Sequence, residues 1–175
     1  NINPDGIYVD MTLGGGGHSE AILQRLKSGK LFGFDQDIYA INKAKSRLKN
    51  YPNFIAINAN FSNANEELLS RNISKVDGIV FDLGVSSFQF DQAERGFSYR
   101  FDAPLDMRMN QQQNLSAEIV VNTYSQEELE TIFFKYGEEK FSRNITKNIV
   151  KYRNQETIKT TFQLVDIIKK SLPAK

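Results

Sequence analysis

Short apolar runs alternate with helical patterns over the first half of the chain. Apolar runs of β type occupy residues 7–12, 31–35, 54–57 and 76–83. Helical spacing of apolar residues lies between them, at residues 18–27 and 38–48 and around Leu68 and Leu69. Strands that alternate with helices pair in parallel through right-handed crossovers. The pattern therefore predicts an α/β fold with an open, Rossmann-like, doubly wound parallel sheet.

The second half of the chain has a different pattern. Residues 85–114 show no period and are rich in Phe, Asp, Arg and Met. A loop of this length is commonly functional or disordered, and its aromatic content argues against disorder. The remaining sequence is helical, with predicted helices at residues 116–123, 125–136, 141–153 and 161–172. Ser125 and Glu128 form a capping-box pattern at the start of the second of these helices.

Composition excludes several classes of function. The chain has 22 Lys and Arg against 21 Asp and Glu, so bulk positive charge does not drive binding to nucleic acid. The absence of Cys excludes a disulfide scaffold and thiol catalysis, and the single His excludes a multi-His site, so we expect no metal. Apolar runs long enough for a membrane span and a signal-peptide pattern are both missing. We expect a soluble, cytoplasmic protein without membrane contact.

Four glycines, Gly14 to Gly17, follow the first predicted strand. Glycine lets the backbone approach a ligand closely, and the helix that follows presents free N–H groups. A flexible turn is the alternative interpretation. A phosphate-binding P-loop is disfavoured because His18 follows Gly17, where that motif has Lys.

Two acidic residues end predicted strands at the same edge of the sheet. Asp35 lies 35 − 14 = 21 residues after Gly14, the place of a carboxylate that accepts hydrogen bonds from a cofactor ribose. A helix N-cap is the alternative, because Asp35 and Asp37 both precede the next helix. Asp82 ends the fourth strand, with a solvated loop acid as its alternative. Together these features favour a nucleoside cofactor, either a nicotinamide dinucleotide or S-adenosylmethionine.

Several longer motifs give a specific resemblance. They read DMTLGGGGHS at 10–19, FDLGVSSFQFD at 81–91, ERGFS at 94–98, DAPLDMRM at 102–109 and YGEEKF at 136–141. In this order they closely resemble the MraW family of bacterial methyltransferases, which make N4-methylcytidine in small-subunit ribosomal RNA. The likeness runs over the whole chain.

The resemblance implies a cofactor and the residues that hold it. The family uses S-adenosylmethionine and carries a helical domain inserted after the fourth strand of its methyltransferase domain. By resemblance, Gly16, Gly17 and His18 hold the methionine end of the cofactor and Asp35 holds the ribose. Phe61 and Asp82 flank the adenine, and Gln89 reaches the cofactor from the following loop. Phe61 and Gln89 are identified by the resemblance alone, and an ordinary core aromatic is the alternative for Phe61.

The resemblance also implies a reaction, methyl transfer to the N4 amine of a cytidine in 16S ribosomal RNA, with the small (30S) subunit as partner. A carboxylate near that amine would polarise its N–H and receive developing positive charge. Asp102 and Asp106 are the candidate catalytic groups, with Asp82 nearer the cofactor, and the choice stays open. Because the chain has no Cys, covalent attack on the base is excluded.

Two groups of residues are candidates for contact with RNA. The loop supplies guanidinium and aromatic planes suited to stacking and phosphate contact: Arg95, Phe97, Tyr99, Arg100, Phe101 and Arg108. A hydrophobic plug is the alternative for Phe97 and Phe101. One face of the predicted helix 141–153 carries a basic stripe of Lys140, Arg143, Lys147 and Lys151. We expect this stripe to follow RNA phosphates, and an ordinary solvated face is the alternative.

We expect the chain to be a fragment, because the family continues on both sides of it. The predicted parts are a cofactor-binding domain (1–88), a substrate and cofactor loop (89–114) and a helical insertion domain (115–175). An uncovered fourth strand invites pairing with a second chain, so a homodimer or swapped dimer is expected. The competing hypotheses are a nicotinamide-dependent oxidoreductase and an inactive fragment that acts only as a binding module.

Overall fold

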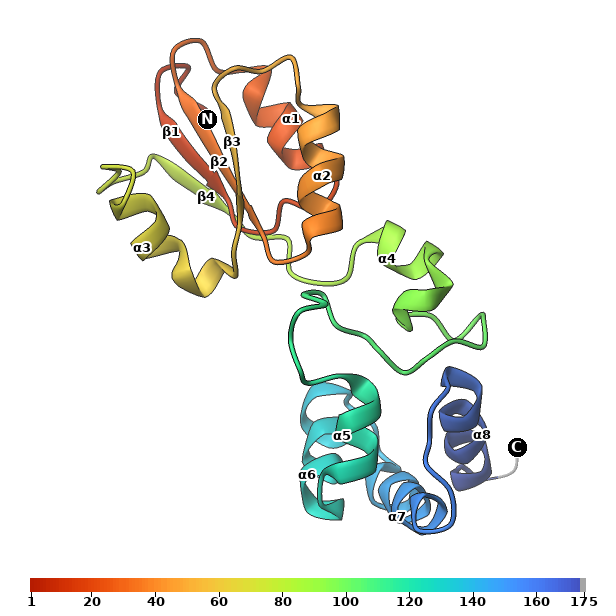
Figure 1. The fold of residues 1–175 in the computed structure, drawn as a ribbon. Coiled ribbons are helices and arrows are strands. Elements are labelled where there is room, and N and C mark those ends of the chain that lie inside the picture. The colour runs from red at the N-terminus through yellow and green to blue at the C-terminus, as the bar shows by residue number, and fades with distance from the viewer. Residues whose placement is uncertain (174–175) are drawn as a thin grey trace. The chain divides into compact units, whose positions relative to one another are not determined.

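The computed structural model describes residues 1–173 of the chain. The chain divides into two compact units, Asn1–Ser86 and Ser87–Lys175. The first unit is an α/β layer structure and the second is helical (Figure 1). No helix within residues 1–173 is long and apolar enough to span a membrane.

The first unit contains a parallel sheet of four strands. The strands are β1 (Ile7–Asp10), β2 (Lys30–Asp35), β3 (Phe54–Asn58) and β4 (Gly78–Val80). Their order in the sheet is β3-β2-β1-β4, and every pairing is parallel. The chain therefore winds outward from β1 to β3 and then returns to the other side of β1, which confirms the predicted Rossmann-like fold. The reversal lies at the carboxyl end of β1, where open α/β sheets bind their ligands.

Helices cover both faces of this sheet. Helices α1 (Gly17–Leu23) and α2 (Ile38–Arg47) lie on one face, and α3 (Ala64–Leu69) lies on the other (Figure 1). Successive residues of β2 alternate between the two sides because side chains alternate along a strand. Leu31 packs with Leu48 on the side of α1 and α2, whereas Phe32 and Phe34 pack with Leu68 of α3. The near-continuous apolar run of β2 thus reflects burial on both faces.

Strand β4 is shorter than the predicted run 76–83. Within the described residues it pairs with β1 alone, and Leu83 beyond it is 70% exposed. The ladder ends after Val80 because the Asp82 N–H donates to the Thr12 side chain rather than to the β1 backbone. The apolar pattern therefore overestimated the paired length. The expected self-association through this edge stays a prediction.

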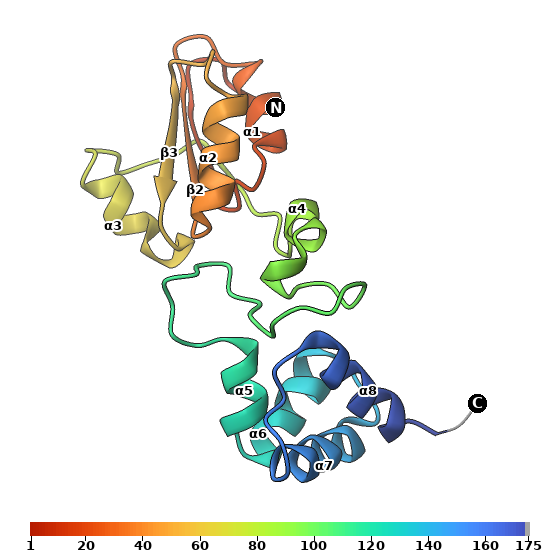
Figure 2. The ribbon, with the colours of Figure 1, turned by 45° about the vertical axis from the view of Figure 1, so that its right-hand side comes forward.

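The second unit is built from short helices. They are α4 (Ser87–Asp91), the 3₁₀ turn η2 (Ala93–Arg95), α5 (Ala117–Thr123), α6 (Gln126–Thr131), the π-helix η3 (Ile132–Tyr136), α7 (Ser142–Arg153) and α8 (Thr161–Ser171) (Figure 2). Helices α4 and η2 are too short to give a period, so the sequence pattern missed them. Leu129, Ile145, Ile149 and Ile167 form the centre of the core.

The predicted helix 125–136 changes type partway. Its capping box is confirmed, since the Ser125 hydroxyl accepts from Glu128 N–H and the Glu128 carboxylate accepts from Ser125 N–H. After Thr131 the backbone widens to a π-helix, in which Gly137 N–H donates to the Ile132 carbonyl at 3.3 Å. Apolar spacing does not distinguish this wider turn from an α-helix.

The aperiodic segment is folded onto the helices. Leu105 is buried in the helical core, its N–H donates to Lys159 O at 3.0 Å and its carbonyl accepts from Glu118 N–H at 2.7 Å. The Thr161 hydroxyl donates to Phe101 O at 2.7 Å. These backbone bonds order the segment without a regular element of its own.

Candidate functional site

The glycine turn lies between β1 and α1 at the carboxyl edge of the sheet. Gly14 and Gly16 have φ of +50° and +80°, which side chains of L-residues rarely adopt. A Cβ on Gly16 would also lie 3.1 Å from Leu48 Cδ1. A Cβ on Gly15 meets no atom within 4 Å, so that side of the turn is open. The turn therefore leaves its backbone accessible on that side.

Asp35 holds this turn in place. Its Oδ2 accepts from Gly14 N–H at 2.8 Å, and its Oδ1 accepts from Asp37 N–H at 2.9 Å. The cap of α2 is Asp37, whose carboxylate accepts from Tyr39 N–H at 3.0 Å. The capping alternative therefore belongs to Asp37, and Asp35 ties the end of β2 to the glycine turn.

Burial raises the pKa of the Asp35 carboxyl above its ordinary value, although the hydrogen bonds from Asp37 and Gly14 oppose this shift. The carboxylates of Asp37 and Asp10 raise the pKa further. Additional hydrogen-bond donors would favour the ionised form. Two neighbouring hydroxyl groups, such as those of a ribose, are donors of this kind.

Asp10 is a site residue that sequence reasoning did not identify. It is 1% exposed, and its carboxylate accepts from the Ser19 hydroxyl at 2.8 Å and from Thr12 N–H at 3.1 Å. The Thr12 hydroxyl in turn accepts from Asp82 N–H at 2.7 Å. This network joins the end of β1 to α1 and to the segment after β4. An acid at the end of a parallel strand was the available signal, as it was for Asp35.

The structure brings His18 and Asp82 together. His18 Nδ1 lies 3.8 Å from Asp82 Oδ2, and both side chains are largely exposed. An exposed pair of this kind contributes little to stability. Its value for the site is geometric, because it places one residue of the glycine turn beside one residue that follows β4.

Phe61 lies in η1 (Phe61–Asn63), just after β3. Its ring meets the Phe81 ring edge-on, with centroids 5.7 Å apart. Both rings are exposed, so Phe61 is not an ordinary core residue. The pair joins the segments that follow the two outer strands of the sheet.

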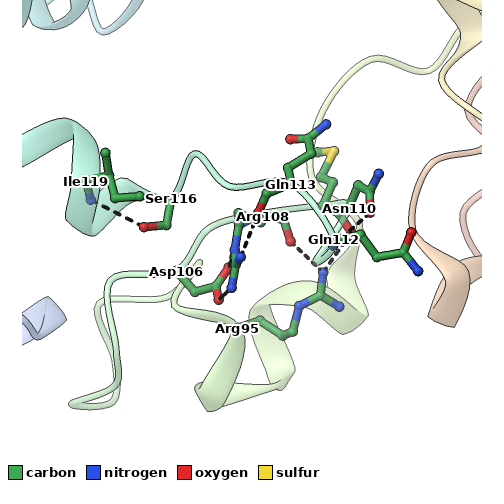
Figure 3. A network of polar contacts seen from close by, with 9 residues as sticks. Arg95, Asp106, Arg108, Asn110, Gln112, Gln113, Ser116 and Ile119 are labelled. Atoms are coloured by element: carbon green, nitrogen blue, oxygen red, sulfur yellow. Dashed lines mark hydrogen bonds and ion pairs between the residues drawn. The ribbon is translucent and has the colours of Figure 1, made fainter.

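The remaining predicted site residues lie in the second unit. Gln89 is buried in α4, whereas Asp102 is exposed and its Oδ1 accepts from Phe162 N–H at 3.2 Å. Asp106 accepts two hydrogen bonds from the Arg108 guanidinium, at 3.0 Å to Oδ1 and 2.7 Å to Oδ2 (Figure 3). That Gln89, Asp102 and Asp106 act together with the glycine turn stays a prediction.

Arg108 controls the protonation of Asp106. Its hydrogen bonds hold the pKa of the Asp106 carboxyl below the ordinary value, against a smaller opposing effect of burial. The third guanidinium nitrogen of Arg108, Nη1, donates to Gln113 O at 2.7 Å. Asp106 is therefore a weak base that fixes the shape of its loop.

One residue predicted to contact RNA does not fit that role. Arg95 is 3% exposed, and its Nη2 donates to Arg108 O at 2.9 Å and to Met109 O at 3.2 Å (Figure 3). The prediction was wrong for Arg95 because its guanidinium serves the backbone of its own loop. Tyr99, Arg100 and Phe101 are exposed.

Three residues of the basic stripe, Arg143, Lys147 and Lys151, lie on α7, whereas Lys140 lies two residues before the first residue of this helix. Ile145 and Ile149 are buried against the helical core. The four basic side chains are all exposed: Lys140, Arg143, Lys147 and Lys151.

Replacing Asp106 by Asn should destabilise the chain by about 1–2 kcal/mol at neutral pH, because charge-assisted bonds to Arg108 are lost. Since the folded-state pKa is lowered, the ionised carboxylate contributes stability above the unfolded-state pKa and loses it as the pH falls through the folded value. Urea denaturation at several pH values measures this. The difference in unfolding free energy from the parent chain should shrink as the pH falls below 3.8, the ordinary pKa of an Asp carboxyl.

The matched control is Asp166→Asn on α8, an exposed position where a change within about 0.5 kcal/mol is expected. A loss for Asp106→Asn that is independent of pH would contradict this account of the ion pair.

Solved structures give only partial matches. A proposed rRNA methylase from Clostridium thermocellum matches with a TM-score of 0.41 and 22% identity, over 48% of this chain and 45% of that chain. An rRNA methylase from Streptococcus thermophilus matches with a TM-score of 0.38 and 26% identity, over 47% and 48%. The fold assignment rests on the strand order given above.

Sequence comparison is more informative. Ribosomal RNA small subunit methyltransferase H of Clostridium botulinum strain Loch Maree is 58% identical over 100% of this chain, and that of strain Okra is 57% identical. The chain spans 57% of the length of these curated relatives. The profile of the MraW methylase family matches residues 1–175. With the whole chain covered, the protein belongs to the MraW methylase family.

Proposed function

We propose that this chain carries the cofactor-binding part of an enzyme that transfers a methyl group from S-adenosylmethionine to the N4 amine of a cytidine in small-subunit ribosomal RNA. The observation that carries the proposal is the open glycine turn fixed by Asp35 at the switch point of the sheet. Membership of the MraW methylase family supports the reaction class. The names of the 58% identical relatives support the RNA substrate.

The residues of the first unit fit this cofactor. The bare backbone at Gly16 and Gly17, together with His18, would hold the methionine end. Asp35 would accept hydrogen bonds from the ribose, for which its half-buried carboxylate is suited. The exposed side chains of Phe61 and Asp82 would contact the adenine. Gln89, which the resemblance alone assigns to the cofactor, stays a prediction. When bound, the cofactor supplies an electrophilic methyl group on a sulfonium.

The protein must orient the cytosine amine and take up its proton. That amine is a poor nucleophile because its lone pair is delocalised into the ring, so alignment is the main contribution, up to about 7–11 kcal/mol. A carboxylate beside the amine would polarise the N–H bond. Of the two candidates, Asp102 is favoured, because it is exposed and accepts one backbone hydrogen bond, whereas both oxygens of Asp106 are bound to Arg108.

Cofactor binding tests the proposal in isothermal titration calorimetry. We expect the chain to bind S-adenosylmethionine and not NADH. Asp35→Asn should weaken binding by about tenfold or more, because a charged acceptor is lost, while Asp166→Asn on α8 should bind like the parent. Circular dichroism checks that both variants are folded. Binding of NADH with no heat from S-adenosylmethionine would instead favour the oxidoreductase hypothesis.

A methyl-transfer assay separates an enzyme from a binding module. The chain is incubated with small ribosomal subunits and labelled S-adenosylmethionine, and the RNA is digested to nucleosides. Label in N4-methylcytidine supports the proposed reaction. Binding of cofactor without any transfer by this chain would support the binding-module hypothesis.

The basic stripe gives a separate prediction about RNA. Arg143→Glu combined with Lys147→Glu should weaken binding to small-subunit RNA and make it less dependent on salt, by about 0.7–0.9 in the log–log slope for each lost phosphate contact. Filter binding over a range of salt concentrations measures both quantities. Lys169→Glu with Lys170→Glu, exposed on α8, is the matched control. Equal slopes for both double variants would remove the stripe from the RNA interface.

A further inference from the structure

The segment after β4 is attached to the carboxyl edge of the sheet through a side chain. The ladder between β1 and β4 ends with a bond from Met11 N–H to Val80 O at 2.9 Å. Two residues further along, Asp82 N–H donates at 2.7 Å, and its acceptor is the hydroxyl oxygen of Thr12. A threonine hydroxyl thus replaces a backbone carbonyl as the acceptor at the point where β4 leaves the sheet.

Other contacts hold Asp82 only weakly. Within residues 1–173 its other polar contact is the 3.8 Å pair with His18, and both of these side chains are largely exposed. Water screens such a pair, so it contributes little. The residues that follow give no support, since Leu83 is 70% exposed and a Cβ on Gly84 would meet no atom within 4 Å. The position of Asp82 therefore rests mainly on the Thr12 hydroxyl.

Thr12 is itself held firmly. Its N–H donates to one oxygen of the Asp10 carboxylate at 3.1 Å, and the other oxygen accepts from the Ser19 hydroxyl at 2.8 Å. Asp10 is almost completely buried, where hydrogen bonds are electrostatically stronger than in water. Because threonine is branched at Cβ, rotation about its χ1 is restricted. A fixed backbone and a stiff side chain together aim the hydroxyl at the segment after β4.

We propose that Thr12 is a positioning residue for the nucleoside end of the cofactor, and that it acts through Asp82. Its hydroxyl sets where Asp82 lies relative to the glycine turn, and Asp82 contacts the adenine. The identity of the ligand rests on the proposed function. The methionine end, which the glycine turn holds, does not depend on this hydroxyl.

Amide hydrogen exchange, followed by NMR without any cofactor, tests the anchor. Thr12→Val keeps the branched shape of the side chain and removes the acceptor. We expect Asp82 N–H to exchange about threefold to tenfold faster in this variant, as the loss of one hydrogen bond allows. Thr12→Ser should restore the protection. The other amides of β1 and β4 should exchange as in the parent, which also shows that the variant is folded. Unchanged exchange at Asp82 in Thr12→Val would overturn the inference.

Isothermal titration calorimetry tests the link to the cofactor, with S-adenosylmethionine and 5′-methylthioadenosine as probes. The second probe keeps the adenosine and lacks the amino-acid end. We expect Thr12→Val to weaken both probes by the same factor, about threefold to tenfold, because the lost contact acts on the part that they share. Thr12→Ser should recover most of the affinity. A larger loss for S-adenosylmethionine than for 5′-methylthioadenosine would indicate a distorted glycine turn and would overturn the positioning role.

The matched control is Thr123→Val. It removes the same hydroxyl from an exposed residue at the end of α5, where the hydroxyl donates to Ile119 O of its own helix at 2.7 Å. Exchange at Asp82 and both affinities should stay as in the parent. Equal affinities of the parent and Thr12→Val for both probes would overturn the inference and leave the cofactor proposal intact. A parent chain that binds neither probe would refute the cofactor proposal itself.

Discussion

The carboxyl edge of the sheet depends on two carboxylates that accept hydrogen bonds from the turns beyond their strands. Asp35 binds Gly14 N–H and Asp37 N–H, and Asp10 binds Thr12 N–H and the Ser19 hydroxyl. Together they fix the glycine turn over the ends of β1 and β2. Burial raises the pKa of Asp35, so further hydrogen-bond donors would favour its ionised form. A ligand that brings hydroxyl groups supplies them, and in this way the same contacts serve the fold and the proposed cofactor.

In the second unit, hydrogen bonds of charged side chains likewise order a segment of irregular structure. Residues 97–109 form no helix or strand, and their backbone groups bond partly to other backbone groups and partly to charged side chains. Arg95 and Arg108 bind carbonyl groups of the loop, and Asp106 binds Arg108 (Figure 3). These three residues shape the loop, which leaves Asp102, Tyr99 and Arg100 for contact with other molecules.

Much of this architecture was predictable from sequence, because the spacing of apolar residues and the acidic residues at strand ends are local signals. Residue spacing predicted the sheet and the crossover helices. It also predicted that Asp35 either binds a ribose or caps the next helix, with Asp37 as the second possible cap. The short length of β4 could not be predicted from spacing. Its apolar residues indicate burial, which the described residues do not provide. The burial of Arg95 was also missed, since composition cannot tell a guanidinium that binds its own backbone from one that faces RNA. Asp10 was missed although it occupies the same kind of position as Asp35. Phe61 and Gln89 were named by family resemblance alone.

The most direct test of the central claim is an amide NMR titration of the labelled chain with S-adenosylmethionine. The account predicts that, in the first unit, the amide signals of residues 14–18 and of the segments after β2 and β4 shift on binding. Cofactor binding that leaves the glycine amides unchanged, or a spectrum that does not change at all, would contradict it.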